Sequence, residues 1–379
     1  MAASGTVVRS RCNLSVALRQ PARRTNGTTR PALNTVYDVN ESNDHPSASD
    51  ICLTDRFGRV HNSLRLSVTD RCNIRCFYCM PETGVKFMPR EQLLTFEELQ
   101  RLAELLVRRC GIRDIRITGG EPLVRRGLVT LIEMLAKIDG LEDLSLTTNG
   151  ILLAEHVDEL KSAGLRRLNI SLDTLNAATF QKISKRDGLQ KVLAGIDASV
   201  SAGFESVKIN TLAIRGTTEP EIVDLVRFAA GHSVPIRFIE FMPLDGDQAW
   251  KRDDVLGGDE ILRIIESGLG KLMPAARANS AQPAEAFVSP EGAEVGIIRS
   301  VSKPFCGACN RIRLTADGAI RNCLFAGEET PIRDLIRGGG TDDDLIRAFQ
   351  ESVGKKHAAH GIEGDGFRPP DRPMYAIGG

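Results

Sequence analysis

Short segments with alternating apolar and polar residues are interleaved with longer amphipathic segments between residues 53 and 244. The alternating segments predict strands at 64–69, 114–118, 144–147, 167–173, 207–212 and 236–241. Apolar residues three and four positions apart predict helices between them, at 96–110, 128–138, 155–163, 189–202 and 219–230. Strands that alternate with helices in this way predict parallel βαβ units.

The alternation within the strands distinguishes between two parallel architectures. In the first strand Leu64 and Leu66 fall on one face and Arg65 and Ser67 on the other, and the next four strands repeat this pattern. A doubly wound sheet, which helices cover on both faces, would show continuous apolar runs instead. Six units are too few to close an eight-stranded barrel. The pattern therefore predicts an α/β fold, a partial (β/α)6 barrel whose concave interior is polar and binds a ligand.

The composition and the pattern of apolar residues change twice along the chain, which predicts three regions. Residues 1–50 form an expected flexible extension; up to Thr35 it contains Arg but no Asp or Glu, which fits an organelle transit peptide or an ordinary bacterial extension. Residues 51–245 form the expected barrel, and 246–379 a smaller C-terminal domain. In the last region we expect a helix at 259–267, a loop or linker at 274–290, helices near 332–337 and 342–353, and an irregular tail.

The charge balance limits the kinds of partner. The 379 residues include 49 Lys and Arg and 49 Asp and Glu, so no overall field attracts nucleic acid or an anionic membrane. No apolar run approaches the ~20 residues needed to cross a bilayer. We expect a soluble cytoplasmic protein, or one in the mitochondrial matrix if residues 1–50 are a transit peptide.

Six of the nine cysteines fall into two groups of three. Cys72, Cys76 and Cys79 follow the first strand, at the carboxyl end where barrel enzymes keep their chemistry. Three thiolates leave one of the four tetrahedral positions of zinc unfilled, and the nearest histidine, His61, precedes the strand. A [4Fe–4S] cube held by three cysteines instead leaves one iron open for a small molecule. The spacing favours an iron–sulfur cluster over zinc or structural thiols.

The second group, Cys306, Cys309 and Cys323, has the same character. It again offers three thiolates without a fourth, and a zinc ribbon would need another cysteine or a histidine pair. A second cluster with an open iron fits this group better than zinc.

Three cations fall on the expected inner face of the barrel: Arg65, Arg116 and Lys208 come from three different strands. Singly, each could be an ion-paired or surface residue. Together inside a cavity they are costly unless an anion neutralises them. No Gly-x4-Gly-Lys-Ser/Thr loop is present, so a nucleotide triphosphate would not be bound by a P-loop.

The cysteine groups occur with other recognisable segments. CNIRCFYC at 72–79 resembles the signature of radical S-adenosylmethionine (radical SAM) enzymes, and GGEP at 119–122 resembles their motif for the SAM amino group. The whole pattern from Asp55 to Gly379 resembles the GTP 3′,8-cyclases of molybdenum cofactor biosynthesis, the MoaA family. The stretches that carry this resemblance are 55–59, 66–72, 117–123, 146–150, 169–173, 241–243, 305–315 and 378–379.

The resemblance implies two [4Fe–4S] clusters and SAM as cofactors. It assigns the clusters to Cys72, Cys76 and Cys79 and to Cys306, Cys309 and Cys323. It assigns SAM binding to Tyr78, Gly120, Ser171 and Met242. It assigns GTP binding to Arg65, Arg116, Thr147, Lys208, Arg311, Ile312 and Arg313. It also implies that the terminal Gly378 and Gly379 enter the active site and contribute to catalysis.

In that family a deoxyadenosyl radical abstracts hydrogen from C3′ of GTP, and the sugar radical attacks C8 of guanine. The product is (8S)-3′,8-cyclo-7,8-dihydroguanosine 5′-triphosphate, which a separate cyclic pyranopterin monophosphate synthase converts further. The resemblance also implies a flavodoxin- or ferredoxin-type reductant and a homodimer. Two other functions stay open at this point: another radical SAM enzyme with an auxiliary cluster, such as a peptide-modifying one, and a non-catalytic zinc-binding protein.

Overall fold

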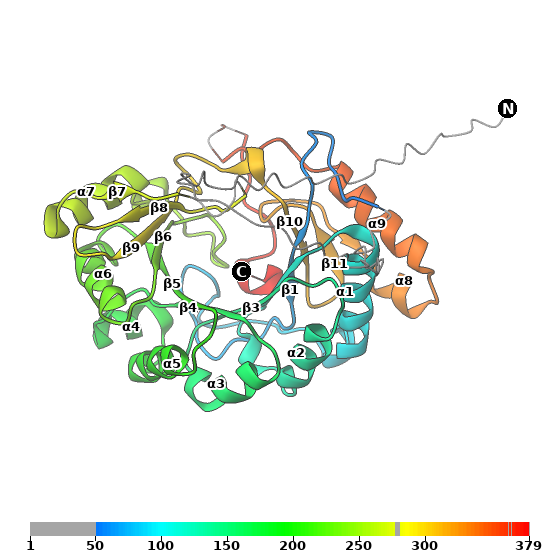
Figure 1. The fold of residues 1–379 in the computed structure, drawn as a ribbon. Helices are drawn as coiled ribbons and strands as arrows, with labels where there is room; N and C mark the ends of the chain where they lie inside the picture. The colour runs from blue at the N-terminus through cyan, green and yellow to red at the C-terminus, as the bar shows by residue number, and fades with distance from the viewer. Residues whose placement is uncertain (1–50, 277–280, 363, 365, 379) are drawn as a thin grey trace, which may run out of the picture.

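Twelve strands form one sheet in the computed structural model, in the order β12-β11-β10-β1-β2-β3-β4-β5-β6-β9-β8-β7 (Figure 1). The structure describes residues 51–276, 281–362, 364 and 366–378, so the expected extension at 1–50 lies outside the described residues. The strands are β1 (Ser63–Ser67), β2 (Asp114–Thr118), β3 (Asp143–Thr148), β4 (Arg167–Ser171), β5 (Ser206–Ala213), β6 (Ile236–Glu240), β7 (Met273–Pro274), β8 (Glu285–Val288), β9 (Glu294–Ile298), β10 (Arg311–Leu314), β11 (Ala319–Arg321) and β12 (Thr330–Pro331).

The helices lie on the outer, convex side of this curved sheet, except for the short α10, which lies near the centre of the barrel (Figure 1). They are α1 (Phe96–Cys110), α2 (Leu128–Ala136), α3 (Leu153–Ser162), α4 (Ala177–Ser184), α5 (Leu189–Ser201), α6 (Ile222–Gly231), α7 (Gly258–Leu269), α8 (Arg333–Arg337), α9 (Asp342–Gly354) and α10 (Met374–Ile377). The helix α1 begins at a capping box between Thr95 and Glu98 and ends at Gly111, which adopts the left-handed conformation with φ 73°. Its apolar stripe, including Leu99 and Leu102, is fully buried in the core.

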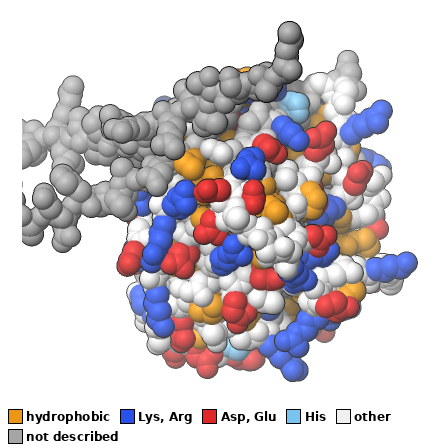
Figure 2. Space-filling view, turned by 90° about the vertical axis from the view of Figure 1, so that its right-hand side faces the viewer, with side chains coloured by type: hydrophobic (Ala, Val, Ile, Leu, Met, Phe, Trp, Pro, Cys, Tyr) orange, Lys and Arg blue, Asp and Glu red, His pale blue; other side chains and the backbone are white. Residues whose placement is uncertain are grey.

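The six strands expected from the sequence, β1 to β6, are parallel and paired in chain order. Leu64 and Leu66 of β1 are fully buried in the core on the helix side, whereas Arg65 faces the other way. The predicted partial barrel is therefore confirmed. Acidic and basic side chains are interspersed on the face seen in Figure 2, in keeping with the equal numbers of the two charges.

The C-terminal region extends both edges of the barrel. On one side β10 pairs in parallel with β1, and β11 and β12 follow it in antiparallel order. On the other side β9 pairs in parallel with β6, and β8 and β7 complete that edge. The sheet thus continues across residue 245, and the expected division into domains there stays a prediction.

The prediction of a loop or linker at 274–290 is wrong in part, because β8 lies within it and β7 begins just before it. These short strands depend on the pairing of β8 with β9 and of β7 with β8, which no local pattern revealed. The helix α4 was also missed, and α10 lies in the tail that the sequence left irregular. Among the described residues, no helix is long and apolar enough to cross a membrane.

Candidate active site

One cavity at the carboxyl ends of the parallel strands collects most of the residues expected to bind the first cluster and SAM. Its lining includes the cysteines Cys72, Cys76 and Cys79 and the expected SAM residues Tyr78, Gly120, Ser171 and Met242. Thr147, expected to contact GTP, lines the same cavity. Residues of β3, β4, β5 and β6 and of the loops after β1 and β2 thus meet at one place, as the carboxyl ends of parallel strands do.

The glycine pair after β2 supports the first cysteine loop by close backbone contact. Gly120 donates its N–H to the carbonyl of Thr69 at 2.8 Å, and Glu121 donates to Arg71 at 2.8 Å. A Cβ atom at Gly120 would lie 2.5 Å from the carbonyl oxygen of Arg71, so no larger residue fits there. The other side of the loop rests on α4, where Phe77 donates its N–H to the carbonyl of Ile183 at 3.1 Å.

The first three thiols fit a [4Fe–4S] cluster. Burial, followed by the charge of Glu121, raises the pKa of the Cys72 thiol to about 11. Burial also raises the pKa of Cys76 and Cys79 well above the ordinary range. Thiolates in such a place need compensating positive charge, which iron supplies. No three His, Cys, Asp or Glu side chains among the described residues could hold a single metal ion, but in a cube each thiolate binds its own iron.

Two buried carboxylates in this region were not assigned a role from the sequence. Asp173 lines the cavity, accepts a 2.5 Å hydrogen bond from the Tyr78 hydroxyl, and has its pKa raised by burial. Burial raises the pKa of Glu121 to about 7, although it accepts hydrogen bonds from Thr148 and from the N–H of Asn149. Both residues lie in the segments that carried the family resemblance, which was the available signal.

The second group of cysteines lies at the opposite end of the strands. Cys306, Cys309 and Cys323 line a separate cavity together with Arg59, Lys356 and His360. Cys309 just precedes β10, whereas Cys72 follows β1, and these two strands are parallel. Burial raises the pKa of the Cys309 thiol, but Arg311 and Lys356 outweigh this and lower it to about 6. A thiol that ionises this readily is suited to bind iron.

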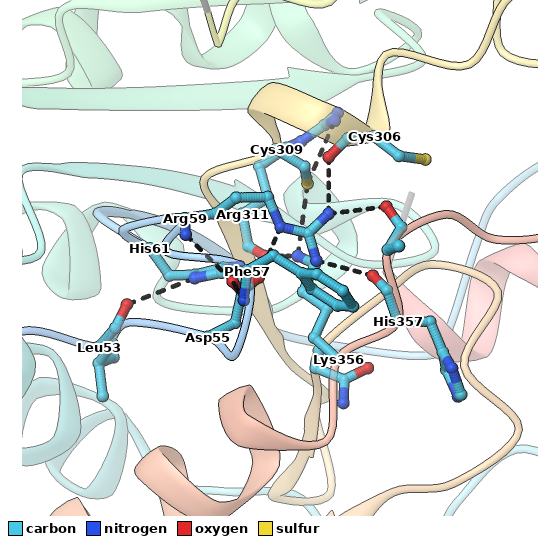
Figure 3. Close-up of polar contacts among 12 residues, drawn as sticks. Leu53, Asp55, Phe57, Arg59, His61, Cys306, Cys309, Arg311, Lys356 and His357 are labelled. Carbon is cyan, nitrogen blue, oxygen red and sulfur yellow. Dashed lines mark hydrogen bonds and ion pairs between the residues drawn. The ribbon is translucent and has the colours of Figure 1, made fainter.

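The three expected GTP contacts on β10 face two ways. Arg311 donates to the Cys309 sulfur at 3.5 Å (Figure 3). Its guanidinium lies 4.6 Å from the ring centre of Phe305. Arg313 lies directly opposite Arg65 in the sheet. Ile312 lies between Arg311 and Arg313 in the sequence, but its side chain is fully buried in the core. Its contribution to GTP binding therefore stays a prediction.

The inner face between the two cysteine sites carries the expected cations and two that were missed. The register aligns Arg65 with Arg116, and places Arg167 of β4 and Arg237 of β6 on the same inner face as Lys208. Arg167 followed the alternation of its strand and could have been found. Arg237 lacked this signal, because its neighbour on that face of β6, Ile239, is apolar.

The pKa of Arg116, Lys208 and Arg237 is lowered, whereas the hydrogen bond to Asp143 raises the pKa of Arg167. Burial and then the charges of Arg237 and Arg167 lower the pKa of Lys208 to about 8. Burial, Arg167 and Arg65 lower the pKa of Arg237 to about 10, and burial with Arg65 and Arg237 lowers the pKa of Arg116 well below its usual value. Asp114 partly offsets the charge of Arg65, and Asp143 pairs with Arg167. The remaining positive charge favours binding of an anion.

The C-terminal tail enters the barrel, and its helix α10 lies near the centre of the molecule in Figure 1. Arg313 donates to the carbonyl of Gly378 at 2.6 Å, and Met374 lines the first cavity. A Cβ atom at Gly378 would lie 2.6 Å from the Cβ of Ser67 and 2.8 Å from Oγ1 of Thr118. Gly379 lies outside the described residues.

Comparison with known proteins identifies this arrangement. Residues 66–229 match the Radical SAM superfamily, and residues 234–362 match the family called Molybdenum Cofactor Synthesis C. The crystal structure of Streptococcus suis SuiB is similar in fold, with a TM-score of 0.52 over 76% of this chain and 67% of SuiB, at 13% sequence identity. The fold and the sequence match therefore define a radical SAM enzyme.

Two curated relatives narrow the class. The GTP 3′,8-cyclase of Rhodopirellula baltica is 63% identical over 87% of this chain and 92% of its own length. The GTP 3′,8-cyclase of Corynebacterium glutamicum is 45% identical over 88% of this chain and 91% of its own length. The chain belongs to the GTP 3′,8-cyclase family, which confirms the resemblance seen in the sequence. Enzymes of this family use two [4Fe–4S] clusters and SAM.

The tail provides a first test of the site. Replacing Gly378 with Val should leave the iron content and the melting temperature unchanged, because the residue ends the described chain and buries little apolar surface. Turnover of GTP should nevertheless fall at least tenfold, because the side chain would meet Ser67 and Thr118 and displace the tail. Anaerobic turnover measured beside iron content checks this, with Gly339→Val as the control since that glycine also has positive φ but open space around it. Full turnover by Gly378→Val would show that the tail does not need to enter the barrel.

Proposed function

We propose that this protein converts GTP to (8S)-3′,8-cyclo-7,8-dihydroguanosine 5′-triphosphate, the first step of molybdenum cofactor biosynthesis. The observation that carries the proposal is the order of groups along the barrel. A three-cysteine site follows the carboxyl end of β1, another precedes the amino end of β10, and the incompletely neutralised cations lie between them. A ligand that spans this interior must present an anionic part to the cations while its other end faces the second site.

The residues divide the work of binding. Tyr78, Gly120, Ser171 and Met242 would hold SAM beside the first cysteine loop. When bound there, the first cluster supplies the electron that cleaves SAM to methionine and the deoxyadenosyl radical. The role of the barrel is to place C3′ of GTP next to that radical and to exclude water from it.

The cations would hold the triphosphate. Arg116, Lys208 and the additional Arg167 and Arg237 come from four different strands, so they can surround an anion rather than line one side of it. Arg311 and Arg313 lie nearer the second cysteine site, where we place the guanine, next to the cluster that Cys306, Cys309 and Cys323 would hold. Gly378 would close the space between the two ends.

The partners follow from the same reaction. SAM cleavage consumes an electron, so we infer a low-potential reductant of the flavodoxin or ferredoxin type. The cyclic nucleotide would pass to a cyclic pyranopterin monophosphate synthase. A homodimer, the cytoplasmic location and the absence of nucleic-acid and membrane partners stay predictions.

Separating the two clusters tests the proposal directly. Cys76→Ala should abolish formation of deoxyadenosine, because the first cluster supplies the electron. Cys309→Ala should still form deoxyadenosine but lose the cyclised nucleotide. An anaerobic count of iron and sulfide, expected at about eight irons in the unchanged enzyme, accompanies both product assays. Equal loss of SAM cleavage in the two variants would contradict the assignment, and zinc in place of iron would contradict the proposed function.

The inner cations generate a binding test. Lys208→Ala removes a charge-assisted contact of roughly 1.5–3 kcal/mol, which corresponds to a ~10–150-fold weaker GTP affinity. SAM affinity should hardly change. Equilibrium binding under anaerobic conditions measures both constants, and Lys191→Ala, on the exposed side of α5, is the matched control. Unchanged GTP affinity would make Lys208 a structural residue.

The lowered pKa of Lys208 also predicts a pH dependence. The free enzyme loses the Lys208 proton as the pH rises through about 8, whereas bound GTP favours the protonated form. GTP affinity should therefore fall above pH 8, by up to about tenfold per pH unit from this group. Lys208→Arg keeps its charge through this range and should flatten the profile. Identical profiles of the two enzymes between pH 7 and 9 would exclude Lys208 as the titrating contact.

A further inference from the structure

The segment Asp55 to Arg59 has no part in the proposed reaction, although it belongs to the pattern that carried the family resemblance. It forms a tight turn in which Oδ1 of Asp55 accepts hydrogen bonds from the N–H groups of Phe57 and Arg59 at 2.9 and 3.0 Å. Oδ2 accepts from Nε of Arg59 at 2.6 Å, and both charged side chains are buried. The turn therefore fixes the direction of the Arg59 guanidinium.

The remaining nitrogens of that guanidinium join two segments that are far apart in the sequence. Nη1 donates to the carbonyl of Cys306 at 2.7 Å and to that of Ala358 at 2.9 Å, and Nη2 donates to the carbonyl of His357 at 2.7 Å (Figure 3). Arg59 thus ties the loop that carries Cys306 and Cys309 to the segment that follows α9. Three backbone carbonyls held by one buried ion pair define the distance between these segments.

Lys356 lies at the start of this second segment and is directed at the cysteine loop. Its side chain is buried, with 3% of the residue exposed. Nζ donates to the sulfur of Cys309 at 3.4 Å and to the carbonyl of Arg311 at 2.8 Å. In the described part of the chain Lys356 forms no ion pair with Asp or Glu. The hydrogen bonds of this buried side chain therefore go to the Cys309 sulfur and the Arg311 carbonyl, and Cys323 is the other thiol whose charge acts on it.

The other groups around Lys356 leave this pairing undisturbed. Asp55 is neutralised by Arg59, which lies against it. His61 is buried behind Asp55, and its burial and the charge of Lys356 lower its pKa to about 4, so it is neutral near pH 7. Arg311 is the other cation at Cys309, with Nη2 at 3.5 Å from the sulfur.

We propose that Lys356 is a positioning residue that raises the reduction potential of the second cluster, by donating a hydrogen bond to the Cys309 sulfur from a place that the Asp55–Arg59 pair fixes. The proposal rests on the assignment of that cluster to Cys306, Cys309 and Cys323. Hydrogen bonds to cluster sulfurs and nearby positive charge stabilise the reduced cluster, which carries one more negative charge. The segment from Asp55 to Arg59 then acts on the cluster through the placement of Lys356.

The experiment is an EPR-monitored redox titration of the reconstituted, full-length enzyme, compared with Lys356→Met and Lys356→Gln. Binding of SAM alters the signal of the first cluster, so the titration with and without SAM assigns each signal to its site. In Lys356→Met the midpoint potential of the second cluster should become more negative, while that of the first cluster stays unchanged. Lys356→Gln retains an N–H donor without the charge. Its second-cluster midpoint potential should lie between that of the unchanged enzyme and that of Lys356→Met. Lys355→Met makes the same change at the exposed neighbouring residue and should move neither potential.

The results of the titration that would contradict the proposal are distinct from one another. Two clusters whose potentials are the same in all variants would overturn the proposal. Loss of the second cluster from both Lys356 variants would also overturn it, because Lys356 would then retain the cluster rather than tune it. If the unchanged enzyme holds only one cluster, the assignment of the second cysteine site fails, and that failure is seen before any variant is compared.

Discussion

Mutual repulsion among buried cations is the constraint on which the arrangement of this barrel depends. Arg65, Arg116, Arg167, Lys208 and Arg237 share the inner face, and burial together with their neighbours' charges lowers the pKa of Arg116, Lys208 and Arg237. Such a set costs stability in the free protein. On the opposite face of the same strands, residues such as Leu64 and Ile117 are fully buried under the helices. This apolar packing stabilises the sheet and so keeps the cations close together. An anionic ligand that binds inside the barrel therefore reduces the electrostatic repulsion among these cations.

The strands at the two edges of the barrel add to this cluster of cations and flank it. The strand β10 brings Arg313 alongside Arg65, and β9 covers the strand that carries Arg237. Arg313 would not lie at the site if the six-stranded barrel were the whole fold. The second cysteine site, the β10 cations and the tail all depend on one segment that returns to the edge of the first strand.

The sequence predicted what depends on local pattern and spacing. The short apolar segments located the six parallel strands, five of them with strict alternation, and cysteine spacing located both cysteine sites. It did not reveal β8, because this four-residue strand owes its conformation to pairing with β7 and β9 rather than to its own residues. Nor could it find Arg237, on a strand whose inner face is otherwise apolar, or Lys356. The role of Lys356 depends on contacts between residues 47 positions apart, which periodicity does not encode.

The pairing of β1 with β10 also has a consequence for biosynthesis of the chain. Ser63 lies opposite Arg311 in the register, so the strand made first waits for one that leaves the ribosome almost 250 residues later. At ~5–20 residues per second, that interval lasts about ten to fifty seconds. Throughout it, the hydrogen-bonding edge of β1 is open, and an open edge is a template for pairing with another chain. The nascent barrel is therefore most exposed to aggregation before β10, at Arg311–Leu314, is translated, and long-range closure of this kind folds slowly.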